Sequence, residues 1–259
     1  MKSRITHLVA ALALACAGAH AAPTAEVGYG ALWGTTVNFN SLAPGAFDSV
    51  VIDGLLSSGG VQFGERFAGQ ELAIAKVPRA GFAAQDWFDD LSFGGPTAGL
   101  TLLAGEAGAN LGAYHYGDAD GAALFGIGPQ NSDGSDPTGS GAISARFATP
   151  VYALGLQLRD ADAGAMLLNL YRLDGSLIEA VDLGGRNDGF YAFARTGGVA
   201  DIAGFTLTNR DAYYGVSIDN LLLAPSAAVA AVPEPASLAL LLTGLGAMWA
   251  AARRRPARR

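Results

Sequence analysis

Acidic side chains in short glycine-containing stretches are the residues of this sequence that offer most chemistry. In GDADG, Asp118 and Asp120 stand at alternate positions before a glycine, and NSDGSD holds Asn131, Asp133 and Asp136. Alternating oxygen donors in a bent loop suit a hard cation such as calcium. Neither stretch completes an EF-hand loop, because the distal glutamate is missing at the required spacing. Solvated turns are the interpretation that we favour, since Asp beside Gly commonly serves turn geometry, and calcium is the candidate ligand beside it.

Residues for catalysis are sparse. After residue 21 the sequence holds a single histidine, His115, which stands between two tyrosines and is explained most simply as a half-exposed strand residue. Paired carboxylates can hydrolyse glycosides. The less regular half of the chain offers the acidic residues Glu65, Glu71, Asp86, Asp89, Asp90 and Glu106. We assign no catalytic residue, and an exported polysaccharide hydrolase stays an alternative.

Aromatic residues offer one further binding element. Trp33 and Trp87, the latter followed by Phe88, could form a platform on which sugar rings stack. Packing in the core is the interpretation that we favour for these rings.

The apolar pattern of the chain predicts short β-strands. In VYALGLQLR, leucines 154, 156 and 158 recur at period two, as on the buried face of a strand. AMLLNLYRL runs into the Asp-Gly turn of LDGS, which is typical of a tight hairpin. We predict an all-β sandwich over residues 22–224 and a small-residue linker over 225–231. Within the sandwich, RAGFAAQDWFDDL (79–91) predicts a loop with a helical turn, and a short helix is the alternative.

The beginning of the chain, residues 1–21, has the layout of a secretory signal peptide. Lys2 and Arg4 precede an apolar stretch, and the end at Ala19-His20-Ala21 fits the small-x-small cleavage rule. Cys16 is the only cysteine, so cleavage would exclude disulfides, zinc–thiolate sites and thiol catalysis. Lipid attachment at Cys16 is the alternative. Residues 22–231 hold nine Lys and Arg against 22 Asp and Glu, which disfavours nucleic acid and anionic lipid as partners.

The end of the chain, residues 232–259, joins a polar motif, an apolar run and a basic cluster. The motif is Val232, Pro233, Glu234 and Pro235. The run over 237–252 predicts a transmembrane helix that is short for the bilayer core, and an amphipathic helix is the alternative. By the positive-inside rule the basic cluster stays cytoplasmic; it comprises Arg253, Arg254, Arg255, Arg258 and Arg259.

In order and spacing, these three elements resemble the PEP-CTERM sorting tail of proteins exported by Gram-negative bacteria. The resemblance covers residues 232–259. It implies recognition by an exosortase, a membrane-embedded peptidase that processes its substrates near the motif, and an association with exopolysaccharide and biofilm. We therefore expect export, anchoring in the inner membrane by the C-terminal helix, and processing to the cell surface or extracellular matrix.

The second half of the body also resembles the jelly-roll sandwich common in PEP-CTERM substrates and carbohydrate-binding modules. The stretches ARFATPVYALGLQLRD, LLNLYRLDGSLIEAV and DIAGFTLTNRDAYYGVSIDNLLL carry this resemblance. A structural calcium joining the first and last strands is common in such folds, so the resemblance adds Asn40 and Asp219 to Asp118 and Asp120 as candidate ligands. The function we expect is a non-enzymatic binding or structural module linked to exopolysaccharide; the alternative is the hydrolase named above.

Overall fold

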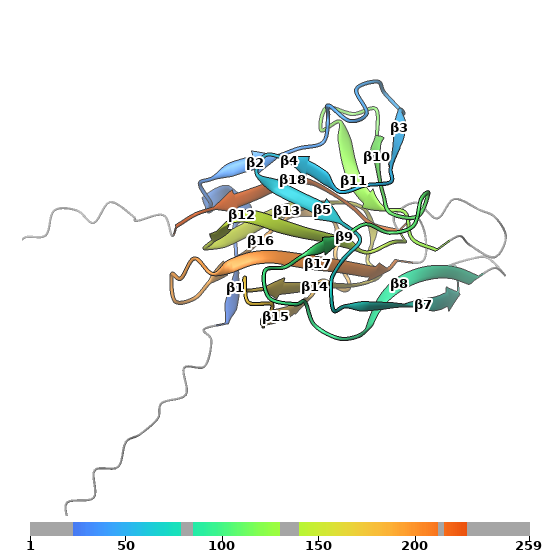
Figure 1. Cartoon of the computed structure of the whole chain (residues 1–259). Coiled ribbons are helices and arrows are strands. Elements are labelled where there is room, and N and C mark those ends of the chain that lie inside the picture. Colours follow the sequence, from blue (N-terminus) through green and yellow to red (C-terminus); the bar gives the residue numbers. More distant parts are fainter. Residues whose placement is uncertain (1–22, 79–84, 130–139, 212–214, 227–259) are drawn as a thin grey trace, which may run out of the picture.

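The computed structural model describes residues 23–78, 85–129, 140–211 and 215–226, which build a sandwich of two large antiparallel sheets. The larger sheet runs in spatial order through β1 (Thr24–Val27), β16 (Asn187–Arg195), β13 (Ala153–Asp162), β18 (Ser217–Ala224), β11 (Ala122–Gly126), β10 (Leu111–His115) and β3 (Ser49–Ile52), with β2 (Thr35–Val37) also paired to β18. The smaller sheet runs through β15 (Leu177–Asp182), β14 (Ala165–Tyr171), β17 (Ile202–Arg210), β12 (Ile143–Val151), β5 (Val61–Gly64) and β4 (Leu56–Ser58). Figure 1 shows the two layers, and the predicted all-β sandwich is confirmed.

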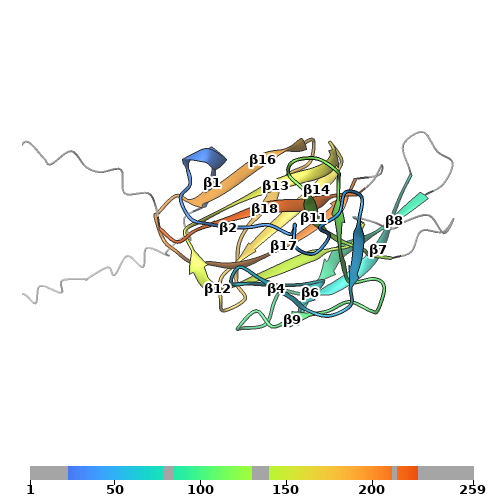
Figure 2. The ribbon, with the colours of Figure 1, turned by 90° about the horizontal axis from the view of Figure 1, so that it is seen from above.

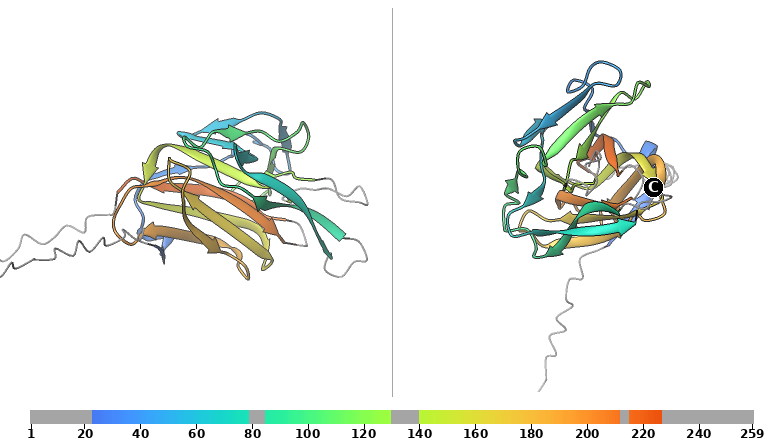
Figure 3. Two further views of the ribbon diagram at one scale, coloured as in Figure 1. Left: turned by 60° about the horizontal axis from the view of Figure 1, so that its bottom comes forward. Right: turned by 90° about the vertical axis from the view of Figure 1, so that its right-hand side faces the viewer.

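Shorter elements complete the described chain. A 3-10 turn, η1 (Tyr29–Ala31), follows β1, and β6 (Arg66–Phe67) pairs with β9 (Leu102–Leu103). A long two-stranded ribbon forms between β7 (Glu71–Pro78) and β8 (Gln85–Phe93) and projects from the sandwich, as Figure 3 shows. The hairpin predicted at LDGS joins β14 to β15, where Gly175 has a φ of 86° that only glycine adopts without strain.

The prediction of a loop with a helical turn over residues 79–91 was wrong for the part that the structure describes. Residues 85–91 belong to strand β8, which pairs with β7 so that Trp87 lies opposite Lys76 and Asp89 opposite Ile74. These cross-strand pairs join residues of two different segments on either side of residues 79–84. A local pattern of acidic and aromatic residues does not reveal them, and they decide the conformation.

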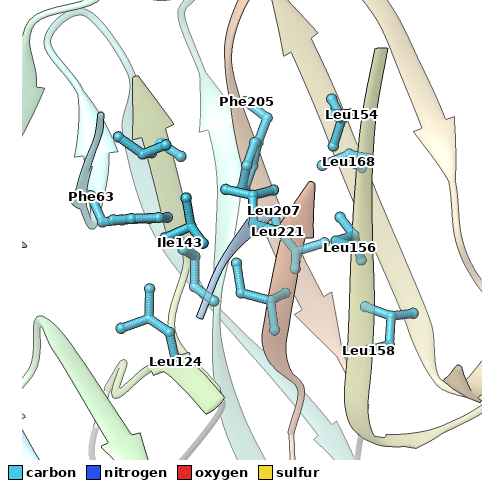
Figure 4. Packing of buried hydrophobic residues seen from close by; sticks show 14 of the residues in the cluster. Phe63, Leu124, Ile143, Leu154, Leu156, Leu158, Leu168, Phe205, Leu207 and Leu221 are labelled. Carbon is cyan, nitrogen blue, oxygen red and sulfur yellow. The ribbon is translucent and has the colours of Figure 1, made fainter. Parts of the chain in front are cut away.

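The core lies between the two sheets. Leu154, Leu156 and Leu158 on β13 are fully buried and point toward Leu168 of β14 and Phe205 of β17, as Figure 4 shows. Burying one such side chain contributes about 1.5–3 kcal/mol to folding, so this shared layer holds the sheets together. The alternation predicted for VYALGLQLR is confirmed at these leucines. Its other face, with Gln157 and Arg159, therefore points away from the core.

Both ends of the described chain lie at one end of the sandwich. Thr24 at the start of β1 is opposite Arg195, and Ala224 at the end of β18 is opposite Ala153, which itself pairs with Ala194. The β7–β8 ribbon projects at the other end, as Figure 2 shows from above. Among the described residues, no helix has the length and hydrophobicity needed to cross a bilayer.

Candidate functional site

The sequence-predicted sorting elements fall outside the described residues. These are the signal peptide (1–21), the motif from Val232 to Pro235, and the arginines 253, 254, 255, 258 and 259. The last described strand, β18, ends at Ala224. The site residues that can be placed are therefore those of the sandwich.

Three of the four candidate calcium ligands gather on the outer face of the larger sheet, and the fourth, Asn40, accepts a hydrogen bond from the amide of Ala122. Asp118 and Asp120 lie in the loop between β10 and β11, and Asp219 lies on β18, where it pairs in register with Gln157 of β13. Oδ2 of Asp118 is 2.5 Å from Nη2 of Arg159, and Oδ2 of Asp120 accepts a hydrogen bond of 2.9 Å from Nε2 of Gln157. We call Asp118, Asp120, Gln157, Arg159 and Asp219 the outer-face cluster.

Buried charge dominates the outer-face cluster. Asp219 is fully buried, and burial raises the pKa of its carboxyl to about 6, with Asp118 and Asp120 adding to the increase and Arg159 opposing it. Oδ1 of Asp219 and Nη1 of Arg159 are both buried and have no hydrogen-bond partner among the described residues. The guanidinium of Arg159 also lies 4.4 Å from the centre of the Tyr116 ring. Arg159 is thus the cation around which three carboxylates are arranged.

The residues fit a calcium ion only in part. The free Oδ1 of Asp219 is a suitable ligand atom, but an ion would compete with Arg159 for Asp118 and Asp120. Oδ1 of Asn40 already accepts a hydrogen bond of 2.8 Å from the amide of Ala122. Among the described residues, no group of three or more His, Cys, Asp or Glu side chains has an arrangement that could hold a metal ion. Calcium at this place stays a prediction.

The other residues singled out in the sequence have separate places. His115 is a half-buried residue at the end of β10, as expected, and its Nδ1 accepts a hydrogen bond from the amide of Gly117. Core packing was wrong for Trp33, which is 79% exposed beside the end of β18, and correct for Phe88, which is 1% exposed. Trp87 is half-buried on β8, with Nζ of Lys76 4.6 Å from its ring centre. The tryptophans therefore do not share one stacking platform.

A second group of carboxylates surrounds a cavity of about 660 Å³ between the sandwich and the base of the β7–β8 ribbon. We call it the acidic pocket. Its charged lining residues are Glu65, Arg66, Glu71, Asp89 and Glu106. Apolar surface comes from Leu72, Ile74, Ala104, Ala109 and Pro129. This volume lies in the range of small-molecule binding sites.

The two innermost carboxylates of the acidic pocket are Glu65 and Asp89, each 8% exposed. Burial is the main cause that raises the pKa of both groups, in Asp89 to about 6, and Glu65 contributes to the increase at Asp89. Glu65 forms an ion pair with its neighbour Arg66. Oδ2 of Asp89 accepts one long hydrogen bond of 3.3 Å from the amide of Ala142. Paired carboxylates with raised pKa values in a cavity are typical of functional sites.

The wall of the acidic pocket is held by backbone contacts. The fully buried Asn110 donates to the carbonyls of Ile52 and Gly54 and accepts a hydrogen bond of 2.9 Å from the amide of Gly105. A Cβ atom at Gly105 would lie 2.5 Å from Oε1 of Glu65, so only glycine lets this carboxylate occupy its place. On the other side, the amide of Asp89 donates to the carbonyl of Ser140 at 3.0 Å. The pocket is therefore preformed.

The sequence named the acids of the pocket but not their partners. Glu65, Glu71, Asp89 and Glu106 were among the candidate carboxylates, whereas Asp90 instead pairs with Arg210 and the side chain of Asp86 lies outside the described part. Arg66 and Arg159 were missed. A lone arginine in an otherwise apolar strand, as in LQLRD, is a signal that could have pointed to Arg159.

Comparison of the chain with protein-family models, with curated proteins and with solved structures found no match.

Proposed function

We propose that this protein is an exported surface or matrix protein, sorted by its C-terminal tail, whose β-sandwich binds polysaccharide and catalyses no reaction. The signal peptide over residues 1–21, the transmembrane helix, the jelly-roll type of the sandwich and the exosortase as a partner are parts of this proposal. The observation that carries it is the order of Pro233-Glu234-Pro235, an apolar run and terminal arginines after an acidic β-sandwich.

The placement of the described chain ends supports this proposal. Thr24 and Ala224 lie at the same end of the sandwich, so signal and tail both connect there. A domain held at that end would point the β7–β8 ribbon away from the membrane (Figure 2). Binding groups at the base of this ribbon would then face the extracellular matrix rather than the bilayer.

Sorting is tested with the full chain in a Gram-negative host with and without an exosortase. We expect a protein shortened at both ends in the surface or matrix fraction of the first host. The second host should keep the unprocessed tail in the inner membrane. Replacing Pro233 and Pro235 with Ala should block processing, whereas Pro225→Ala, in the linker, should not. An intact protein that is soluble in the cytoplasm, with both ends uncut, would contradict the proposal.

Binding is tested with the protein released by the first host. We expect retention on the extracellular polysaccharide of that host and no release of reducing ends. Failure to be retained by any extracellular polymer, despite correct processing, would remove the binding part and leave a structural role.

A second candidate function is hydrolysis of polysaccharide, and the acidic pocket is the observation that favours it. Glu65 and Asp89 are buried, have raised pKa values and border the same cavity, as the acid and base of a glycosidase do. The ion pair with Arg66 favours the charged form of Glu65, so Asp89 would be the acid and Glu65 the base. We rank this function second because the order of motif, apolar run and arginines in the tail favours a matrix protein. Release of reducing ends that disappears in both Glu65→Gln and Asp89→Asn would reverse this order.

A further inference from the structure

We propose that the acidic pocket binds the protonated amino group of an amino-sugar polymer. The inference rests on the proposed polysaccharide binding and names both its site and its ligand class. Four properties of the pocket carry it: a carboxylate oxygen that no described residue uses, an excess of negative charge, an adjoining apolar surface, and a volume suited to a sugar unit.

Asp89 supplies the unused oxygen. Its side chain is 8% exposed and borders the cavity, and its Oδ2 accepts only the long bond from Ala142. No described residue donates a hydrogen bond to Oδ1 of Asp89. Asp89 lines the pocket, and its Oδ1 is not among the buried unpaired atoms of the described residues, so a ligand in the pocket can reach it. A ligand that donates to Oδ1 would supply what the protein does not.

The excess charge makes a cation the complementary ligand. Arg66 neutralises Glu65, but neither Asp89 nor Glu106 forms an ion pair among the described residues. The pocket therefore presents two carboxylates without an ion pair among the described residues, and the single cation Arg66 faces four lining carboxylates. An ammonium group can donate to Oδ1 of Asp89 in a charge-assisted hydrogen bond, which is about twice as strong as a neutral one.

Size and shape favour an organic cation over a bare metal ion. A cavity of about 660 Å³ is many times larger than one ion and matches the sites that enclose small organic ligands. Leu72, Ile74 and Pro129 add apolar surface beside the carboxylates, and Ile74 is 56% exposed. The C–H face of a pyranose ring suits such a surface. An amino sugar combines this face with the positive charge.

The decisive experiment measures how tightly the exported protein, after processing at both ends, binds two oligomers of equal length. One is the fully deacetylated glucosamine hexamer, and the other is the N-acetylglucosamine hexamer, which carries no charge. We expect at least tenfold tighter binding of the deacetylated hexamer, weakened by added salt because the contact is ionic. Equal affinity for both hexamers, or tighter binding of the acetylated one, would overturn the proposal.

Variants locate the contact. Asp89→Asn keeps the acceptor for Ala142 but removes the charge, and we expect about a tenfold loss of affinity for the deacetylated hexamer. Glu106→Gln, at an exposed lining position, should cause a smaller loss. Asp182→Asn is the matched control, because it removes one charge on β15 at the far edge of the smaller sheet. A loss of affinity in the control equal to that in Asp89→Asn would refute a site in the pocket.

Two further outcomes separate this inference from the proposed function. A protein that is sorted and retained by neutral polysaccharide but ignores the glucosamine hexamer keeps the proposed function and loses the amino-sugar site. Specific hexamer binding by a protein that is never exported keeps the amino-sugar site and loses the sorting that the proposed function requires. Tight calcium binding that Asp89→Asn abolishes and that excludes the hexamer would show a metal site instead.

Discussion

The outer-face cluster and the acidic pocket are both groups of carboxylates around one arginine, yet they differ in what surrounds them. In the outer-face cluster, Arg159 has a side chain only 7% exposed and reaches Asp118 and Asp120 from the sheet. In the acidic pocket, Arg66 has a side chain 33% exposed and pairs with its own neighbour Glu65. In the first arrangement Arg159 ties two loop carboxylates to the sheet but leaves Oδ1 of Asp219 unpaired, whereas the second arrangement leaves Asp89 facing a cavity.

This difference teaches that acidic composition does not by itself mark a binding site. Gln157 donates a hydrogen bond to Asp120, and Arg159 donates one to Asp118. These contacts hold the loop between β10 and β11 against the sheet. Around the pocket, the ion pair of Arg66 among the described residues is with its neighbour Glu65, and Asp89 accepts one long hydrogen bond from the amide of Ala142. A cluster whose charges are used internally stabilises the fold, and one whose charges remain available can bind a ligand.

The largest expected effect tests how strongly the stability of the protein depends on Arg159 in the outer-face cluster. Arg159→Met leaves Asp219 buried beside two further carboxylates without their cation, and we expect the free energy of unfolding to fall by about 3 kcal/mol. Arg66→Met should lower the free energy of unfolding by only about 1 kcal/mol, because its ion pair is more exposed and Glu65 can take up a proton. Urea denaturation at pH 7 measures both. Equal losses would erase the distinction between the two groups.

The sandwich could be predicted from the sequence because its signal is local. The leucines of β13, and the turn with Gly175 after β14, are patterns of two to ten residues that the structure confirms. Strand β8 could not be predicted, because its hydrogen bonds go to β7 across residues 79–84.

The candidate sites were only partly predictable for the same reason. Asp118 and Asp120 are neighbours in the sequence, and the resemblance to jelly rolls added Asp219. That Arg159 stands among them, or that Glu65 meets Asp89, follows only from the order of strands in the sheets.

The second expected effect is a loss of stability as pH rises. The pKa values of Asp89 and Asp219 are both raised to about 6 in the folded protein, chiefly by burial. Between the ordinary carboxyl pKa and this value the folded state binds more protons than the unfolded state, so the free energy of unfolding falls from about pH 4 to pH 6. Asp219→Asn should remove its share of this slope and stabilise the protein at pH 7 by about 2 kcal/mol.

Urea midpoints measured from pH 4 to pH 7 check this effect and sharpen the comparison. Adding the glucosamine hexamer should flatten the slope that belongs to Asp89, because the bound cation favours its ionised form. It should leave the slope that belongs to Asp219 unchanged. If the hexamer changed the Asp219 share instead, the ligand would bind to the outer-face cluster.

The smallest expected effect concerns calcium at the outer-face cluster. If the ion binds to Asp118, Asp120 and Asp219, adding calcium chloride should raise the melting temperature by roughly 3 °C, a modest gain since Arg159 competes for two of these carboxylates. Asp118→Asn should reduce the increase, and Glu106→Gln in the acidic pocket should not. An unchanged melting temperature with calcium and with chelator would remove calcium from this site.

The position of the last strand has a mechanical consequence. Strand β18 lies inside the larger sheet and is bonded to β13, β11 and β2, and it delivers the chain at Ala224 to the end from which the tail departs. A polymer pulling at the β7–β8 end of a tethered molecule would load these ladders lengthwise, so that many hydrogen bonds must break together instead of one after another. If the protein is anchored by its tail and binds a polymer, as proposed, these ladders would therefore resist traction between the two ends of the sandwich.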